Sequence, residues 1–325
     1  ATKEAEPEKT ADEVSGITDT NATVLQFTPL AYVGVATVAP ANAAPTPMQL
    51  SQVQEQVRTT MANTAVPLLS VRGVTVRFGG IVALDGVSFD VEKGHVCGLI
   101  GPNGAGKTTL FNCLSRLYSY QAGDIQFEGK SITNTPTHEI SQLGMGRTFQ
   151  NLAMFRTLPV RDNIMIGAHS RSSAGFLASA LRLPSVSAEE KRLRDRADQI
   201  MDYLELTAVA DRPAGDLPFG TQKRVEMGRA LAADPKLLLL DEPAAGLNHE
   251  ELKDLGRLIL DVQSRMGITV LLVEHHMSLV MSVSDHIVAL NFGKKIAEGT
   301  PENIQQHPDV IAAYLGSSEN EAAHG

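Results

Sequence analysis

The chain has 325 residues, of which 43% are hydrophobic and 5% aromatic, and it contains no Trp. This composition favours an α/β core of Leu, Ile and Val over an aromatic-rich all-β core. Acidic residues outnumber basic residues by 37 to 28, which argues against a broad basic surface for nucleic acid. The two cysteines, Cys97 and Cys113, form neither a CxxC pair nor a disulfide framework, which indicates a reducing compartment.

The sequence contains no run of about 18 apolar residues, so it predicts no membrane-spanning helix. We therefore expect a protein that is in solution or peripheral to a membrane that other subunits span. The N-terminal segment ATKEAEPEKTADEV is acidic, unlike the basic and then apolar pattern of a secretory signal. Residues 1–66 are rich in Ala and Pro without periodicity, which favours a disordered or linker-like arm. Within them, Met48–Met61 has the apolar spacing of a short helix, so a helix and a plain tether remain alternatives.

From Val66 onward the sequence has the pattern of a folded domain. Leu68–Phe78 and Leu84–Val91 alternate apolar and polar residues and are separated by glycines, which predicts an antiparallel β region. His95–Ile100 is a short apolar run that passes through a glycine-rich turn into helical periodicity over Thr108–Leu117. Strand, loop and helix in this order are the context that a phosphate-binding loop requires.

The second half of the chain alternates predicted helices and strands. Glu189–Leu206 places its apolar residues on one face and predicts an amphipathic helix whose charges face solvent. The apolar runs Lys236–Leu240 and Ile268–Val273 predict buried strands, with a helix between them from about Glu250 to Met266. Strands that alternate with helices predict a parallel sheet.

One motif predicts a phosphate-binding loop directly. Residues 101–109 read GPNGAGKTT and fit G-x-x-x-x-G-K-[ST]. The glycines let backbone N–H groups turn toward phosphate, the helix N-terminus adds its positive end, and the lysine supplies a point charge. The predicted nucleotide-binding residues are Gly101, Pro102, Asn103, Gly104, Ala105, Gly106, Lys107, Thr108 and Thr109, and the hydroxyl of Thr108 is predicted to hold Mg²⁺.

A second motif places two carboxylates at the end of a buried strand. The run Leu237–Leu240 is followed by Asp241 and Glu242, at the sheet edge where α/β proteins bind ligands. Asp241 is predicted to lie behind the Mg²⁺ ion. Glu242 is predicted to polarise the water that attacks the γ-phosphate.

The order of these and other motifs resembles an ATP-binding-cassette (ABC) ATPase, over residues from about 68 to 316. More narrowly, the chain resembles the LivG type, the ATP-binding subunit of branched-chain amino-acid transporters. The motifs that carry the resemblance are the Walker A loop (101–109), the glutamine loop at Gln150, the signature LPFGTQ (217–222), the Walker B strand (237–242), the D-loop (245–248) and the switch histidine His275, together with GRTFQNLAMFRTLPVRDNI and PDVIAAYLG.

The resemblance implies roles for further residues. Phe78 would stack on adenine, and Gln150 would contact Mg²⁺ or the attacking water. His275 would hydrogen-bond the γ-phosphate and hold Glu242 and the water. The implied catalytic residues are thus Glu242, His275, Gln150 and Lys107, and the implied Mg²⁺ residues are Thr108, Gln150 and Asp241. Leu152–Asn163 would form the groove for a short permease helix, although by its residues alone it is equally a plain surface loop.

The signature departs from the general form Leu-Ser-Gly-Gly-Gln. Pro218 and Phe219 replace Ser and the first Gly, Gly220 keeps the second, and Thr221 stands where Gln is expected, before Gln222. The resemblance implies that Phe219, Gly220, Thr221 and Gln222 contact the ATP held by a partner cassette. Because the Ser hydroxyl is lost, we expect the site that this signature completes to be slower than its mate.

The pair His275 and His276 does not predict a metal site. Side chains of adjacent residues at a strand end are expected to point apart, and no third His, Cys or carboxylate has ligand spacing. We expect His276 to be an exposed polar residue.

The resemblance implies an α/β fold: a P-loop NTPase ABC cassette with a RecA-like parallel-sheet core, an antiparallel β subdomain and an inserted α-helical subdomain. The cassette would span residues 67–317, with its helical subdomain at about 150–230, after the arm 1–66 and before a short tail 318–325.

The implied function is ATP hydrolysis, with ATP and Mg²⁺, that energises import of branched-chain amino acids. The implied partners are integral-membrane permease subunits, a second ABC ATPase subunit and, indirectly, a periplasmic or extracellular substrate-binding protein; nucleic acid is not among them. The implied location is peripheral, on the cytoplasmic face of the inner membrane. Alternatives are a urea or amide importer and a lipopolysaccharide exporter; a cassette ATPase acting on nucleic acid or ribosomes and a small P-loop kinase or GTPase fit the motifs less well.

Overall fold

The computed structural model describes residues 66–148, 154–168 and 184–314, with the side chains of 184–189 left out. These residues belong to one compact unit that spans Ala62–Gly325. The predicted helix at Met48–Met61, Gln150 and the predicted tail at 318–325 lie outside the described residues. Among the residues that are described, no helix combines the length and apolar character needed to cross a membrane.

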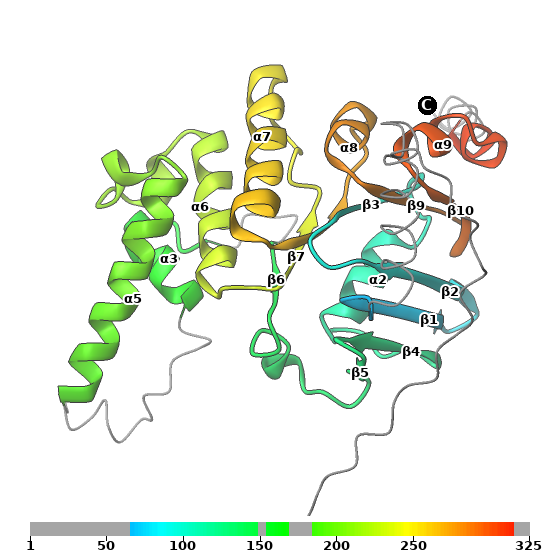
Figure 1. The fold of residues 1–325 in the computed structure, drawn as a ribbon, viewed down its shortest axis with the longest axis horizontal. Helices are drawn as coiled ribbons and strands as arrows, with labels where there is room; N and C mark the ends of the chain where they lie inside the picture. Colours follow the sequence, from blue (N-terminus) through cyan, green and yellow to red (C-terminus); the bar gives the residue numbers. More distant parts are fainter. Residues whose placement is uncertain (1–65, 149–153, 169–183, 315–325) are drawn as a thin grey trace, which may run out of the picture. The chain divides into compact units, whose positions relative to one another are not determined.

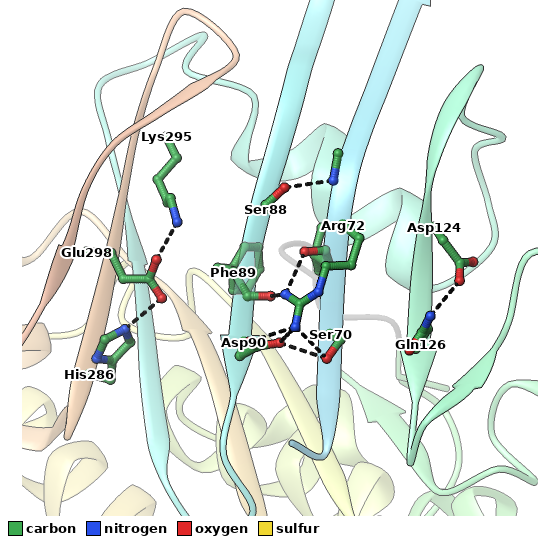
Figure 2. Close-up of polar contacts among 12 residues, drawn as sticks. Ser70, Arg72, Ser88, Phe89, Asp90, Asp124, Gln126, His286, Lys295 and Glu298 are labelled. Carbon is green, nitrogen blue, oxygen red and sulfur yellow. Dashed lines mark hydrogen bonds and ion pairs between the residues drawn. The ribbon is translucent and has the colours of Figure 1, made fainter. Parts of the chain in front are cut away.

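The predicted antiparallel β region is confirmed as a four-stranded sheet with the order β2-β1-β4-β5. Its strands are β1 (Leu69–Phe78), β2 (Ile81–Val91), β4 (Ala122–Phe127) and β5 (Lys130–Ser131). In the first two strands, alternation places one face in the core. Polar side chains also join its strands: Arg72 of β1 donates to the carboxylate of Asp90 of β2 at 2.8 Å (Figure 2).

The predicted parallel sheet is confirmed as a six-stranded sheet with the order β10-β9-β3-β8-β7-β6 (Figure 1). The strands are β3 (Val96–Ile100), β6 (Met145–Arg147), β7 (Leu237–Asp241), β8 (Thr269–Val273), β9 (His286–Asn291) and β10 (Lys294–Gly299). All neighbours run parallel except β9 and β10. Because β3, β8 and β7 are adjacent and parallel, the loops that follow them meet at one edge of the sheet.

The strands of this sheet bury apolar side chains on both faces. In β7, Leu238 and Leu240 belong to one apolar cluster, whereas Leu237 and Leu239 belong to the other. The first cluster contains side chains of α6 and α7, and the second contains side chains of the antiparallel sheet and of α2. The predicted aliphatic core is thus built as two apolar layers that enclose the sheet.

The helices that accompany this sheet include α2 (Lys107–Leu114), α7 (His249–Met266), α8 (Met277–Val283) and α9 (Pro301–Gln305). The predicted helix at Thr108–Leu117 is shorter than expected because the chain turns into the left-handed region at Arg116, where φ is 58°. The helix predicted near 250–266 is confirmed. Its N-terminus is closed by a capping box in which Asn248 accepts from the amides of Glu250 and Glu251.

Three helices, α3 (Val160–Ala168), α5 (Pro184–Tyr203) and α6 (Phe219–Ala232), pack together in the middle of the chain (Figure 1). The predicted amphipathic face of α5 is confirmed, with Ala197, Ile200 and Met201 buried. Close packing between α3 and α6 depends on Gly167, because a Cβ at this position would come within 2.0 Å of the carbonyl oxygen of Arg229. The 3₁₀ turns Thr207–Val209 and Ala214–Asp216 lie between α5 and α6, and a third, Thr137–Glu139, lies between β5 and β6.

Candidate functional site

The loop Gly101–Gly106 joins β3 to α2, as the sequence predicts. Gly101 has a φ of 152°, and a Cβ there would lie 2.3 Å from the carbonyl oxygen of Leu290. Gly106 has a φ of 103°, and a Cβ there would lie 2.7 Å from the carbonyl oxygen of Ala83. Only glycine fits both positions, so the sequence of the loop determines its tight path into the N-terminus of α2.

Lys107, the first residue of α2, is buried, and its ammonium group lies within the loop. Its Nζ donates to the carbonyl oxygens of Gly101, at 2.6 Å, and of Pro102, at 3.1 Å. Burial is the largest influence on the pKa of Lys107 and lowers it, whereas the carboxylates of Glu242 and Asp241 act to raise it. The two carboxylates at the end of β7 are therefore within electrostatic reach of the loop after β3.

Asp241 is the last residue of β7, and its side chain is only 3% exposed. One carboxylate oxygen, Oδ2, accepts a hydrogen bond from the guanidinium of Arg147 at 2.8 Å. The other, Oδ1, is buried and has no hydrogen-bond partner among the described residues. A buried carboxylate oxygen without a donor is suited to a cation or to the water shell of one, so the site fits Mg²⁺.

Glu242 follows directly and has an unusual backbone. Its φ is 48°, a region that a non-glycine residue rarely adopts, and its amide donates to the carbonyl oxygen of Val273 at 2.9 Å. Such strain is found where the surrounding structure fixes a residue for its function. The strand-end Asp-Glu pair predicted from the sequence is therefore held in one fixed turn.

Glu274 is a site residue that the sequence analysis missed. It follows β8, is fully buried, and its Oε1 accepts from the amide of Ala244 at 2.7 Å. Its Oε2 accepts from the amides of His275, at 3.0 Å, and His276, at 3.2 Å. Glu274 thus joins the loop after β7 to the loop after β8. A charged residue directly after a buried apolar strand was the available signal.

The geometric expectations for the histidine pair are wrong in three respects. The rings of His275 and His276 do not point apart, because their centroids lie 4.5 Å from each other. Glu274 supplies a third potential ligand, since ligand atoms of the three residues lie within 4.8 Å of one another. His276 is half-buried at the N-cap of α8 rather than exposed. Glu274 accepts hydrogen bonds from three backbone amides. These bonds explain the cluster as a turn stabilised by Glu274, with His275 exposed beside it.

Phe78 lies at the end of β1 and is not a core residue. Its side chain is 46% exposed, and its ring meets that of Tyr118 edge to face, with centroids 5.3 Å apart. An exposed ring face of this kind is available for stacking.

Comparison with known proteins identifies the family. ABC transporters match residues 84–245, and the branched-chain amino acid ATP-binding cassette transporters match residues 294–320. The high-affinity branched-chain amino acid transport ATP-binding protein BraF of Pseudomonas aeruginosa is 45% identical over 78% of this chain and 99% of its own length. LivG of Escherichia coli, with the same description, is 41% identical over 78% of this chain and 99% of its own. The chain is an ABC transporter ATPase of the branched-chain amino acid type.

A solved structure agrees with this assignment. The crystal structure of the ADP conformation of an ATP-binding cassette of an ABC transporter has a TM-score of 0.68 at 35% identity, over 78% of this chain and 100% of that one. The chain is therefore an ATPase that binds nucleotide, and it is the subunit of a transport system that works with a membrane permease.

The signature of this ABC ATPase lies at the N-terminus of α6. Phe219 is 42% exposed and covers the D-loop, since a Cβ on Gly246 would come within 3.0 Å of its ring. A Cβ on Gly220 would lie 2.5 Å from the carboxylate Oε1 of Glu251 of α7, so a side chain there would require Glu251 to move. Thr221 is half-buried beside them.

The predicted role of Gln222 in this signature is wrong. It was predicted to contact nucleotide, but its side chain is buried, and its Nε2 donates to the carbonyl oxygens of Leu217, at 2.8 Å, and Gly215, at 3.2 Å. From the interior of the protein, the Gln222 side chain therefore stabilises the segment that precedes the signature.

The predicted site residues divide into groups by position. The loop 101–109 follows β3, Asp241 and Glu242 lie at the end of β7, and His275 lies just after β8; the three strands are neighbours in the sheet. Phe78 lies at the end of a strand of the other sheet, and the signature lies on α6. Thr108 is exposed and Thr109 is half-buried in the first turn of α2. Gln150 lies outside the described residues.

Proposed function

We propose that this ABC ATPase energises import of branched-chain amino acids through a membrane permease. The observation that carries the proposal is the C-terminal part of the chain, where β10, α9 and the residues up to 320 match the family of branched-chain amino acid cassettes. The names of BraF and LivG, which match over nearly their whole length, support the same substrate class.

In this proposal, each residue near the loop has a role in ATP hydrolysis. The amides of Gly101–Thr109 and the ammonium of Lys107 bind the β- and γ-phosphates, and Phe78 stacks on adenine. Glu242 accepts a proton from the water that attacks the γ-phosphorus, and ADP leaves as the bond to the γ-phosphate breaks. His275 hydrogen-bonds the γ-phosphate, and Glu274, through three amide bonds, holds His275 beside the Walker B turn.

The same site would hold Mg²⁺ through Thr108, Gln150 and Asp241. The orphaned Oδ1 of Asp241 and the donor set of hydroxyl, amide and carboxylate oxygens support this proposal. When bound, Mg²⁺ neutralises phosphate charge. Arg147 holds the opposite oxygen of Asp241 and thereby fixes which oxygen faces the site.

A permease-binding surface is proposed on the segment before α3. Asn163 is fully buried, and its Oδ1 accepts from the amide of Phe155 at 2.8 Å. Its Nδ2 donates to the carbonyl oxygens of Phe155, Leu158 and Pro159, at 3.0 to 3.2 Å. This one amide fixes the turn and leaves the ring of Phe155 51% exposed. An exposed aromatic ring on a fixed turn suits an apolar contact with a permease helix.

The complete transporter would contain further subunits. In the proposal, the cassette spans residues 67–317, with its helical subdomain at about 150–230. The signature of a second ABC ATPase subunit completes the ATP site of this chain, and Phe219, Gly220 and Thr221 of this chain complete the ATP site of that subunit. The assembly lies on the cytoplasmic face of the inner membrane, and a substrate-binding protein delivers the amino acid from the opposite side.

The proposal is tested by transport. The native complex is captured through a tag on this chain, reconstituted in proteoliposomes with ATP, and supplied with its binding protein and radiolabelled leucine or urea. We expect ATP-dependent uptake of leucine and not of urea. Uptake of urea alone, or co-purification of lipopolysaccharide export subunits, would overturn the substrate class while leaving the ATPase assignment intact.

A further inference from the structure

The phosphate loop is tied to the C-terminal end of the described chain by a single side chain. The backbone amide of Gly101 donates to the hydroxyl oxygen of Tyr314 at 2.9 Å, across 213 residues of sequence. Tyr314 is the last described residue of a helical stretch, residues 308–314, that follows α9. It is half-buried and packs against the apolar cluster that contains Ile304 and Val310.

Gly101 is the residue at which the loop leaves β3, so its position determines where the loop begins. The carbonyl oxygen of Leu290 of β9 closes one side of Gly101, at 2.3 Å from where a Cβ would stand. Further along the loop, the carbonyl oxygen of Ala105 accepts from the amide of Gly293 at 3.1 Å. Residues of the C-terminal part of the chain thus contact both ends of the loop, whereas Lys107 donates hydrogen bonds to carbonyl oxygens of the loop itself.

We propose that Tyr314 is a positioning residue for ATP binding, because its hydroxyl holds Gly101 in the conformation that aims the loop amides at phosphate. This inference rests on the proposed phosphate-binding role of residues 101–109. A backbone amide that is held in place before the ligand arrives loses less conformational freedom on binding. Without the hydroxyl, the Gly101 amide has lost its acceptor and the loop samples other conformations.

The chemistry of the hydroxyl suits this role. Burial raises the pKa of Tyr314 to about 12, although the Gly101 amide opposes that rise. The group therefore stays neutral at every pH at which the ATPase is assayed. A neutral hydroxyl accepts the amide without placing a negative charge beside the phosphates, which a carboxylate in this position would do.

The decisive variant is Tyr314→Phe, which removes only the hydroxyl. We expect the Kd for ATP, measured by equilibrium fluorescence titration of the full chain, to rise about tenfold, as for the loss of one partly buried hydrogen bond. In the assembled transporter, the KM for ATP should rise to a similar extent while kcat changes less than about twofold. An unchanged Kd, or a fall in kcat at constant KM, would overturn the proposal.

A matched control is available in the same chain. Tyr203, at the end of α5, is also half-buried, and its hydroxyl has no hydrogen-bond partner among the described residues. Tyr203→Phe should leave the Kd and the KM for ATP unchanged. If both variants weakened ATP binding equally, the effect would come from general loosening of the fold, and the specific role of Tyr314 would be rejected.

A measurement on the unmodified protein covers the case in which Tyr314→Phe does not fold. Hydrogen exchange should show the Gly101 amide protected to an extent similar to the neighbouring amides of β3. Exchange at the rate of an open loop would contradict the proposed bond. A wild-type chain that bound no ATP would instead reject the proposed phosphate-binding role of residues 101–109, so the two failures are distinguishable.

Discussion

Arg147 and Asp241 form a buried ion pair at 2.8 Å, with side chains that are 11% and 3% exposed. Arg147 lies at the end of β6 and Asp241 at the end of β7, two neighbouring strands. The same guanidinium donates to Asn112 Oδ1 at 2.9 Å and to Ser115 Oγ at 3.0 Å, at the end of α2. One arginine therefore connects the Walker B aspartate to the helix that begins at the phosphate loop.

We expect Arg147→Gln to destabilise the protein by about 3 kcal/mol, because it leaves the Asp241 carboxylate buried without its cation. Urea unfolding followed by circular dichroism measures this loss. Arg257→Gln is the control, since the Arg257 side chain is 77% exposed on α7 and its pair with Asp254 should contribute less than about 1 kcal/mol. Equal shifts for the two variants would contradict the role given to burial.

Glu242→Gln should lower steady-state ATP hydrolysis by about a hundredfold or more, because an amide cannot accept the proton of the attacking water. Nucleotide affinity should change little, since the side chain keeps its size. Lys107→Ala gives the opposite pattern, loss of ATP affinity without unfolding. Phosphate release and equilibrium binding of ATP measure the two quantities, and unchanged turnover in Glu242→Gln would show that another group is the base.

Phe155→Ala should weaken binding of the permease while leaving ATP hydrolysis by the isolated cassette unchanged. The ring is 51% exposed on a turn held by Asn163, so its loss removes apolar contact area and little of the fold. Co-purification of permease subunits with the tagged cassette measures the effect. Leu260→Ala removes a similarly exposed side chain from α7 and should not matter. Full permease recovery with Phe155→Ala would place the contact elsewhere.

The two cysteines should resist thiol reagents in the folded protein. Cys97 and Cys113 are 1% and 0% exposed. Burial raises the pKa of Cys113 to about 11 and raises that of Cys97 further, so neither is a thiolate at pH 8. A disulfide exchange reagent at pH 8 should label no more than a small fraction until denaturant is added, and then both. Rapid native labelling would show that this part of the core opens.

Glu298 of β10 should contribute to the loss of stability in acid (Figure 2). The hydrogen bond from His286, at 3.0 Å, lowers the pKa of Glu298; partial burial opposes this, and Lys295 adds to the lowering. Because the folded pKa is lowered, the stabilisation is present above the unfolded pKa and is lost as the pH falls through the folded pKa. Glu298→Gln should therefore flatten the decline in stability between about pH 5 and pH 3.

Thermal unfolding at a series of pH values measures this slope. Glu190→Gln changes an exposed carboxylate on α5 and serves as the control. A slope that is the same in Glu298→Gln and in the wild type would assign the acid sensitivity to other groups.

Local patterns were sufficient to predict much of the fold and part of the site. Alternation predicted β1 and β2, and the spacing of Gly101, Gly106 and Lys107 predicted the loop and the start of α2. The partners that hold the site were not predictable, because they are distant in sequence. Arg147 lies 94 residues from Asp241, and Tyr314 lies 213 residues from Gly101.

Two predictions failed for physical reasons that a single sequence does not reveal. His275 and His276 were treated as continuing the alternation of a strand, but β8 ends at Val273, and Glu274 bends the chain toward the N-cap of α8. Gln222 was aligned with a motif position, but helical geometry turns its side chain inward to the carbonyls of Gly215 and Leu217. In both cases the backbone direction, not the residue type, decided the contact.

Asn248 is at once the last residue of the D-loop and the N-cap of α7. No residue therefore separates the D-loop from α7. A displacement of the D-loop acts directly on this helix, which is roughly 27 Å long at 1.5 Å per residue. Gln263, near the C-terminus of α7, donates to the carbonyl oxygen of Gly94, just before β3. A displacement of the D-loop would thus be transmitted through α7 to the start of β3, the strand that leads into the phosphate loop.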